Sequence, residues 1–140
     1  MKVFAIIFAF VVAFQSSIMS TKTNEKRTIK VTVLNVTSDS GKVSYALYDK
    51  ADFMKKPLQV QSSKVKGKKS VVVFVDVDPG EYAVVCFHDA NDNDQMDFEA
   101  NGMPLEDYGV SNNPMSYGPP QYDQAKFEVS DKDVTLEIRF

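Results

Sequence analysis

The feature that most constrains the fold of this chain is a series of short segments in which every second residue is apolar. Residues 28–36, 42–49 and 134–140 alternate in this way, and a period of two is typical of a half-buried β-strand. Residues 70–77 and 81–88 are rich in Val and apolar on both faces, which predicts strands buried on both sides. No segment has the 3.6-residue period of an amphipathic helix, so we predict an all-β fold.

Two weaker segments complete the predicted set of seven strands. Residues 58–65 have little apolar content, which predicts an edge strand or an irregular crossover. Residues 124–129 precede the last strand. Turn residues at 38–41, 78–80 and 130–133 predict three hairpins. The β-branched residues 70–77, apolar on both faces, are expected to form a central strand. Strands of this number and spacing favour an antiparallel two-sheet sandwich, Ig-like or transthyretin-like in its wiring, with one long loop.

The N-terminal residues do not resemble part of a folded domain. Residues 3–14 form an unbroken apolar run of twelve after Lys2, which is short for a membrane span but fits a secretory signal. We therefore expect a signal peptide at 1–20, a flexible lead-in at 21–27 and a single domain at 28–140. This predicts a secreted or periplasmic protein with no transmembrane span after signal removal. The alternative is an uncleaved N-terminal anchor.

The charges are unevenly distributed along the chain. Without Lys2 the side chains give 15 − 19 = −4, which argues against a nucleic-acid partner. Residues 22–69 carry 12 basic and 4 acidic side chains, whereas residues 70–125 carry 11 acidic side chains and no Lys or Arg. Cys86 is the only cysteine, so no intramolecular disulfide stabilises the fold, and we expect it to be buried as a small apolar side chain. A long stretch without cationic side chains favours binding of an inorganic cation.

Residues 89–122 show no strand pattern and form an unusually long loop, which is typical of a functional segment. Oxygen-bearing side chains occupy positions 1, 3, 5 and 9 of a loop that begins at Asp89, as in the first part of the D-x-[DN]-x-[DN] calcium pattern. Such hard donors suit Ca²⁺ better than zinc or copper. The predicted ligands are Asp89, Asn91, Asn93, Gln95 through its backbone carbonyl, and Asp97, with a closing carboxylate from Glu99, Glu106 or Asp107.

The match to the calcium pattern is partial. Position 6, a glycine in the EF-hand, is Asp94, and position 12, its bidentate Glu, is Ala100. No helical pattern flanks the loop, so the segment is not an EF-hand. The alternative interpretation is an acidic turn exposed to solvent.

Other residues of this region bear on catalysis and ligand binding. His88 and Asp89 are adjacent in a predicted strand, so their side chains point to opposite faces and do not form a catalytic pair. No nucleophile is identifiable, and we predict no catalytic residue. A second set, on the loop or just after it, is predicted to contact a ligand or, alternatively, to pin the loop to the sandwich: Tyr108, Asn112, Asn113 and Tyr117.

The segments HDANDNDQMD, GMPLEDYGVSNN, PP and DQAKF, all between residues 88 and 127, carry a resemblance to a known family. The chain resembles the bacterial domain-of-unknown-function family 2141, whose members read H-D-x-N-x-N-x-x-x-D, then G-x-P-x-E-G-Y-G-x-S-N, then P-x-F-x-x-A. Asp107 stands where the family usually has glycine, and Tyr122 where it often has phenylalanine. The resemblance covers essentially the whole mature chain and implies export and a β-sandwich, but no activity.

These observations predict an exported, non-enzymatic binding or accessory module whose loop, residues 89–107, binds a structural calcium ion. The ordered loop would then face a glycan or another envelope protein. One alternative is a carboxylate-dependent hydrolase acting on a glycan or a similar envelope substrate, with two of Asp89, Asp97, Glu99 and Glu106 as acid and base. Another is a structural accessory domain without a small ligand.

Overall fold

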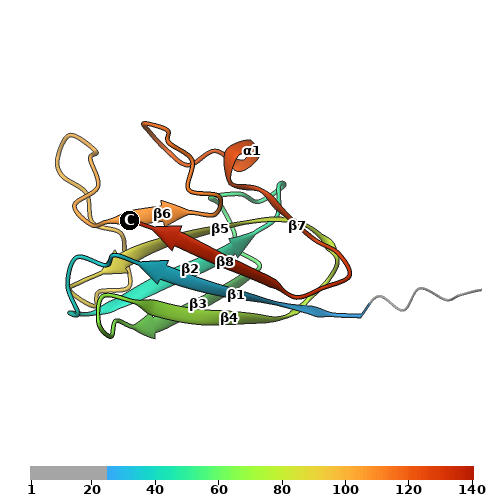
Figure 1. The fold of residues 1–140 in the computed structure, drawn as a ribbon. Helices are drawn as coiled ribbons and strands as arrows, with labels where there is room; N and C mark the ends of the chain where they lie inside the picture. The colour runs from blue at the N-terminus through green and yellow to red at the C-terminus, as the bar shows by residue number, and fades with distance from the viewer. Residues whose placement is uncertain (1–24) are drawn as a thin grey trace, which may run out of the picture.

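The computed structural model describes residues 25–140, which form two packed β-sheets (Figure 1). The described part contains eight strands and one short helix, which confirms the predicted all-β sandwich. The predicted signal peptide at 1–20 and most of the predicted lead-in lie outside the described residues. Within residues 25–140 no helix is long and apolar enough to span a membrane.

The strands are divided unequally between the two sheets. The three-stranded sheet has the order β4-β1-β8, and the five-stranded sheet has the order β3-β2-β5-β6, with β7 paired to the start of β5. The elements are β1 (Arg27–Leu34), β2 (Lys42–Tyr48), β3 (Gln59–Lys64), β4 (Ser70–Val77), β5 (Gly80–Asp89), β6 (Tyr108–Val110), α1 (Tyr122–Ala125), β7 (Phe127–Val129) and β8 (Val134–Arg139).

Three sequence predictions about pairing are wrong. Strands β1 and β2, β4 and β5, and β7 and β8 were expected to form hairpins, but each pair is split between the two sheets. In the first connection, Val36 is fully buried because the chain crosses the core there instead of turning back. The sandwich is also not wholly antiparallel, since β1 and β8 run parallel. Alternation identifies the buried face of a strand but says nothing about its neighbour.

Two further predictions about individual strands are corrected. β4 lies at an edge of its sheet, not in the centre, and its outer residues Val71, Val73 and Val75 are 42 to 48% exposed. β6 lies in the segment expected to contain no strand, and three residues are too few for alternation to appear. The predicted edge position of residues 58–65 is confirmed, because β3 ends the five-stranded sheet.

The main core lies between the sheets and consists of the faces that alternation predicted. Its fully buried aliphatic residues come from β1, β2, β5, β8 and the β1–β2 connection, and Phe74 of β4 joins them. Cys86 is fully buried, as expected. The residues that alternation placed on inward faces and that are fully buried are Ile29, Val31, Val33, Val43, Tyr45, Leu47 and Ile138.

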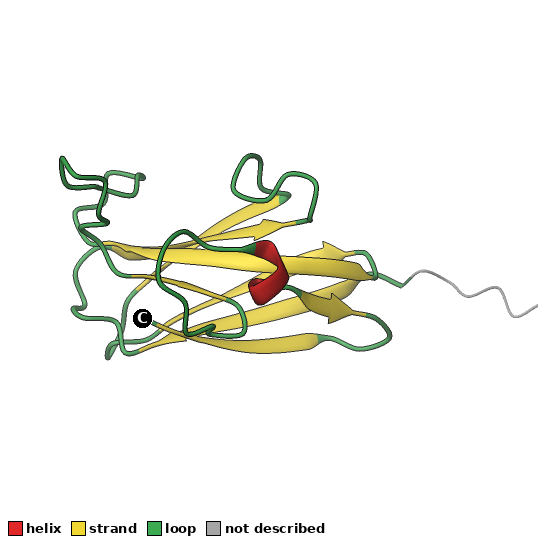
Figure 2. Cartoon of the chain, turned by 90° about the horizontal axis from the view of Figure 1, so that it is seen from above, coloured by secondary structure: helices red, strands yellow, loops and turns green. Residues whose placement is uncertain are grey.

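A second, smaller core covers part of the outer face of the five-stranded sheet. Phe53 makes edge-to-face contacts with Tyr48 and Tyr122 at centroid distances of 5.6 and 5.5 Å, and Figure 2 shows α1 lying over the strands. The buried Ser111 hydroxyl donates to the Ala125 carbonyl oxygen at 2.5 Å and accepts from a β5 backbone N–H. The helix is thereby fixed to one part of this face.

Candidate functional site: the acidic loop

The loop of residues 89–107 leaves the end of β5 and returns to β6 at one end of the sandwich (Figure 1). The β1–β2 connection packs against its first residues. Gly41 has a φ of +66°, and a Cβ there would lie 2.0 Å from the Asp89 carbonyl oxygen and 2.8 Å from the Ala90 Cα. Only glycine fits this contact, because any side chain would displace the loop.

Asp89 organises the first turn of the loop. Its carboxylate is fully buried, and its two oxygens accept the backbone N–H groups of Asn93 at 3.0 Å and Asp94 at 2.9 Å. A buried carboxylate needs such donors to offset the loss of water. The backbone is thereby curled around position 1 of the predicted calcium pattern.

The position that departs most from the calcium pattern nevertheless has its backbone conformation. Asp94, at position 6, has a φ of +63°, the left-handed region that glycine adopts readily and that Asp tolerates better than most residues. The glycine of the EF-hand supplies the sharp turn at this position. The loop therefore makes a left-handed turn there without glycine.

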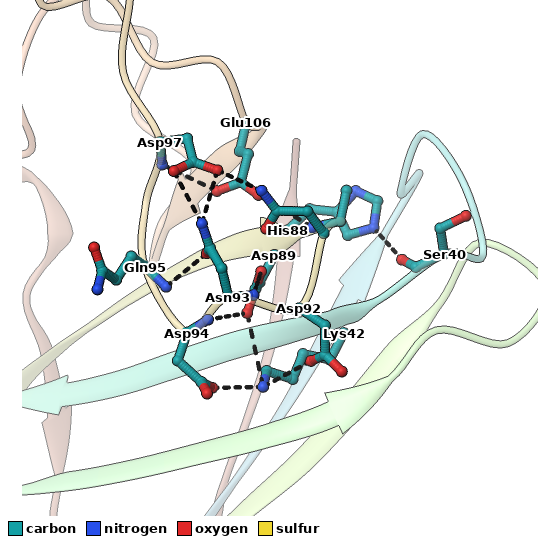
Figure 3. Close-up of polar contacts among 12 residues, drawn as sticks. Ser40, Lys42, His88, Asp89, Asp92, Asn93, Asp94, Gln95, Asp97 and Glu106 are labelled. Carbon is teal, nitrogen blue, oxygen red and sulfur yellow. Dashed lines mark hydrogen bonds and ion pairs between the residues drawn. The ribbon is translucent and has the colours of Figure 1, made fainter.

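Three predicted ligand side chains meet at Asp97. Its carboxylate accepts the side-chain amide of Asn91 at 2.7 Å and that of Asn93 at 3.0 and 3.1 Å; Figure 3 shows the contact with Asn93. The Asn93 side-chain oxygen accepts the backbone N–H of Gln95 at 3.0 Å. The structure thus brings together positions 3, 5 and 9 of the pattern.

The structure distinguishes between the three candidates for the closing carboxylate. Glu106 accepts the backbone N–H groups of Ala90 at 3.1 Å and Asp97 at 3.2 Å, so it joins the two ends of the loop. Glu99 lies in an exposed turn, where its backbone N–H donates to the Met103 carbonyl oxygen at 2.8 Å. Asp107 accepts the Thr37 hydroxyl instead. Glu106 is therefore the candidate that lies with the cluster.

Sequence reasoning missed the cation of this site. The Lys42 Nζ of β2 lies 2.8 Å from Asp92, 2.5 Å from Asp94 and 3.7 Å from the buried Asp89 carboxylate, as Figure 3 shows. Its side chain is 19% exposed, and the hydrogen bonds that it donates to Asp92 and Asp94 raise its pKa. Lys42 is opposite Asp89 in the β2–β5 register, so only knowledge of that strand pairing would have revealed it.

His88 has a structural role beside the loop. Its ring is buried, Nε2 donates to the Ser40 carbonyl oxygen at 2.7 Å, and its backbone N–H donates to the Asp107 carbonyl oxygen at 2.8 Å. It therefore joins the β1–β2 connection to the end of the loop.

The four predicted ligand-contacting residues do not form one group. The Asn112 amide donates to two backbone carbonyls near α1, and Asn113 exchanges two hydrogen bonds with the backbone of β8. These two side chains hold the chain to the sandwich, as the alternative interpretation expected. The Tyr108 hydroxyl donates to the Gly118 carbonyl oxygen at 3.3 Å, and Tyr117 is fully exposed.

A cavity of about 790 Å³ lies on the outer face of the five-stranded sheet, beside the second core. Part of its wall comes from the acidic loop, part from Tyr108 of β6, and part from the segment after β6, including Pro120. Sequence reasoning did not predict it, because its floor depends on the order of β3, β2 and β5 in the sheet.

The chemical type of the oxygen donors in the predicted site determines which metal ions it suits. Among residues 25–140, no three or more His, Cys, Asp or Glu side chains form a group that could hold a metal ion. The predicted site includes two carboxamides and a backbone carbonyl besides carboxylates, and such a set of oxygens suits a hard cation only.

Comparison with curated proteins and with solved structures found no match. A family described as "Uncharacterized protein conserved in bacteria (DUF2141)" matches residues 31–137. This range runs from β1 to β8 and includes the whole acidic loop. The chain therefore belongs to this bacterial family, as its motifs between residues 88 and 127 predicted.

Proposed function

We propose that this protein is a non-catalytic, calcium-binding module whose loop, residues 89–107, holds a structural Ca²⁺. The observation that carries the proposal is the convergence of Asn91 and Asn93 on Asp97, in a loop already curled around the buried Asp89. The left-handed backbone of Asp94 supports it, because the EF-hand loop needs a sharp turn at the same position.

The side chains at Asp97 fit an ion after a small rearrangement. Each Asn now directs its Nδ2 donor at the carboxylate, which is the favourable orientation when no cation lies between them. Rotation of each amide by about 180° places Oδ1 where Nδ2 was, so three oxygen-bearing groups face one centre. Ca²⁺ takes roughly 6–8 oxygens at about 2.3–2.6 Å, and Asp89, the Gln95 carbonyl and water would complete its shell.

Lys42 explains how the loop stays folded without an ion. Its ammonium lies near three of the carboxylates and reduces their mutual repulsion. Calcium and Lys42 therefore both attract the same group of carboxylates. The ion stabilises the folded loop beyond what the lysine provides.

The proposal includes export and a partner outside the cytoplasm. The apolar run at 3–14 supports export. The loop lies next to an apolar cavity, so an ion that orders it also fixes a binding surface, with a glycan or another envelope protein as partner. The hydrolase alternative gains no specific support, because Asp89, Asp97 and Glu106 all accept hydrogen bonds from the loop itself.

Calorimetric titration with Ca²⁺ and thermal melting in calcium or chelator test the proposal. We expect one ion per chain, and a stabilisation of about 2.7 kcal/mol when free calcium is 100 times the dissociation constant. Asp97→Asn should abolish the heat of binding. Asp131→Asn, the same change in the exposed β7–β8 turn, should not alter it. Absence of heat and of any shift in melting temperature for the unmodified chain would refute the proposal.

A further inference from the structure

Beyond calcium, the cavity on the outer face of the five-stranded sheet has the properties of a second binding site. We propose that it binds one elongated, mainly apolar small molecule whose polar end is neutral or positively charged. The inference does not depend on the acidic loop binding an ion, since the floor of the cavity belongs to the sheet.

The floor is hollow because small side chains stand in the middle of the sheet. Ser44 is opposite Ser62, and Ala46 is opposite Val60, in the β2–β3 register. All four line the cavity. Successive side chains of a strand point to opposite faces of the sheet, so residues two apart on β2 and on β3 share the outer face. The larger Phe87, paired with Ser44 on the other side, bounds the hollow. A trough one strand wide therefore runs along β2.

The walls are apolar and adaptable. The acidic loop contributes Met96, Phe98 and Met103, and the β2–β3 connection contributes Met54. Met54, Phe98 and Met103 are 50 to 61% exposed, and an exposed apolar patch of this kind marks a binding surface. Methionine side chains adjust to ligands of irregular shape. The lining also includes Pro57, Pro104, Pro119 and Pro120.

The size of the cavity points to a small molecule. Its volume of about 790 Å³ lies within the roughly 300–1,000 Å³ of small-molecule sites. A protein partner normally covers about 800 Å² of a broader surface, whereas this trough is flanked by the acidic loop, the β2–β3 connection and the segment after β6. A single chain-like ligand lying along β2 fits the geometry best.

The charges around the cavity limit the polar end of the ligand. Asp94 is the only charged residue in the lining. The loop of residues 89–107 carries seven acidic side chains and no Lys or Arg. The single positive charge of Lys42 offsets only one of these seven negative charges. An anionic head group would be repelled at this end, so a neutral or cationic one is expected.

Binding of the neutral fluorophore N-phenyl-1-naphthylamine, followed by displacement, tests the proposal on the full domain. Dodecyltrimethylammonium, dodecanol and dodecanoate share one chain length and differ in head-group charge, so they serve as competitors below their micelle concentrations. We expect saturable binding of one fluorophore, with displacement at least tenfold weaker by dodecanoate than by the other two. Absence of saturable binding would overturn the proposal, and equal displacement by all three would overturn its charge preference.

Substitutions that fill the trough locate the site. Ala46→Phe and Val60→Trp should each weaken fluorophore binding at least tenfold; the second is included because Val60 is 63% exposed and tolerates a larger side chain. Val73→Phe, on the outer face of the other sheet, is the matched control and should bind normally. Unchanged affinity in both trough variants, with unchanged melting temperature, would place the ligand elsewhere.

A pair of charge variants separates the role of Asp94 from that of the loop as a whole. Asp94→Asn and Asp92→Asn each remove one contact to Lys42, but only Asp94 lines the cavity. Asp94→Asn should reduce the preference for the other two competitors over dodecanoate several-fold. Asp92→Asn should change this preference less. Equal effects of the two variants would contradict a local role for Asp94. Titrations in chelator keep this test separate from that of the calcium site.

Discussion

Lys42 is the residue that most changes how the acidic loop is interpreted. Its contacts with Asp92 and Asp94 raise its pKa, so the folded state favours the ammonium form. This contribution to stability is present below the unfolded-state pKa of about 10.4 and is lost only as the pH rises through the higher folded-state pKa. At neutral pH the lysine is therefore a fixed positive charge beside the proposed ion.

Replacement of Lys42 should strengthen calcium binding. Lys42→Met removes a positive charge next to Asp89 that repels the ion, so binding should become roughly fivefold tighter. Calorimetric titration measures the change. Lys64→Met is the control, because Lys64 is the exposed partner of Lys42 on β3. Equal affinity in Lys42→Met and the unmodified chain would show that the lysine and the ion do not interact.

Two tyrosines give opposite predictions for the same change. The Tyr45 side chain is 1% exposed, and among the described residues its hydroxyl lies near Ser70 and the Val33 backbone but makes no hydrogen bond of normal geometry. Burial raises its pKa. Tyr45→Phe should therefore raise the free energy of unfolding by about 1 kcal/mol. The Tyr122 hydroxyl donates to the Glu81 carbonyl oxygen at 3.0 Å, so Tyr122→Phe should lower it by about 1 kcal/mol.

Urea unfolding of both variants measures these changes. The account of Tyr45 is wrong if Tyr45→Phe is destabilised as much as Tyr122→Phe. Sequence alone predicted that Tyr45 lies on an inward face, but it gave no indication that the hydroxyl lacks a partner, because that depends on the facing sheet.

At the scale of elements, the contact between the β1–β2 connection and the acidic loop is the most sensitive to substitution. Gly41 and Gly67 have similar φ angles, +66° and +58°, but a Cβ at Gly67 would meet nothing within 4 Å. Both alanine variants are strained, by about 1 kcal/mol, and only Gly41→Ala also displaces the backbone at Asp89. It should lower stability by at least 2 kcal/mol more and weaken calcium binding.

Thermal melting and calcium titration of the two alanine variants measure this difference. If Gly41→Ala and Gly67→Ala lose the same stability, the close packing at Asp89 does not constrain the loop.

The elements also show what sequence can and cannot predict. Alternation predicted the inward residues of β1, β2 and β8, since burial of one face is a property of each strand alone. It did not predict the neighbours of any strand, because pairing depends on connections that cross the core. The same limit applies to the site: the side chains that meet at Asp97 were predicted from local spacing, whereas Lys42 and the trough floor depend on how β2 pairs with its neighbours.

At the scale of the whole molecule, the acidic loop joins two proposed sites. Asp89 and Asp97 belong to the ion site, and Met96 and Phe98 of the same loop line the cavity. Calcium should therefore tighten binding of N-phenyl-1-naphthylamine, and by linkage the fluorophore should tighten calcium binding by the same factor. Fluorophore titrations in calcium and in chelator measure the coupling. Identical affinities in the two conditions would show that the loop has the same conformation with and without the ion.

A crystal structure of the protein grown with calcium tests the central claim most directly. The account predicts one ion with six to eight oxygens at about 2.3–2.6 Å, including those of Asp89, Asn91, Asn93 and Asp97 and the Gln95 carbonyl. Both Asn amides should be turned so that their oxygens face the ion. An empty loop in which the Asn91 and Asn93 amides still donate to Asp97 at saturating calcium would contradict the account.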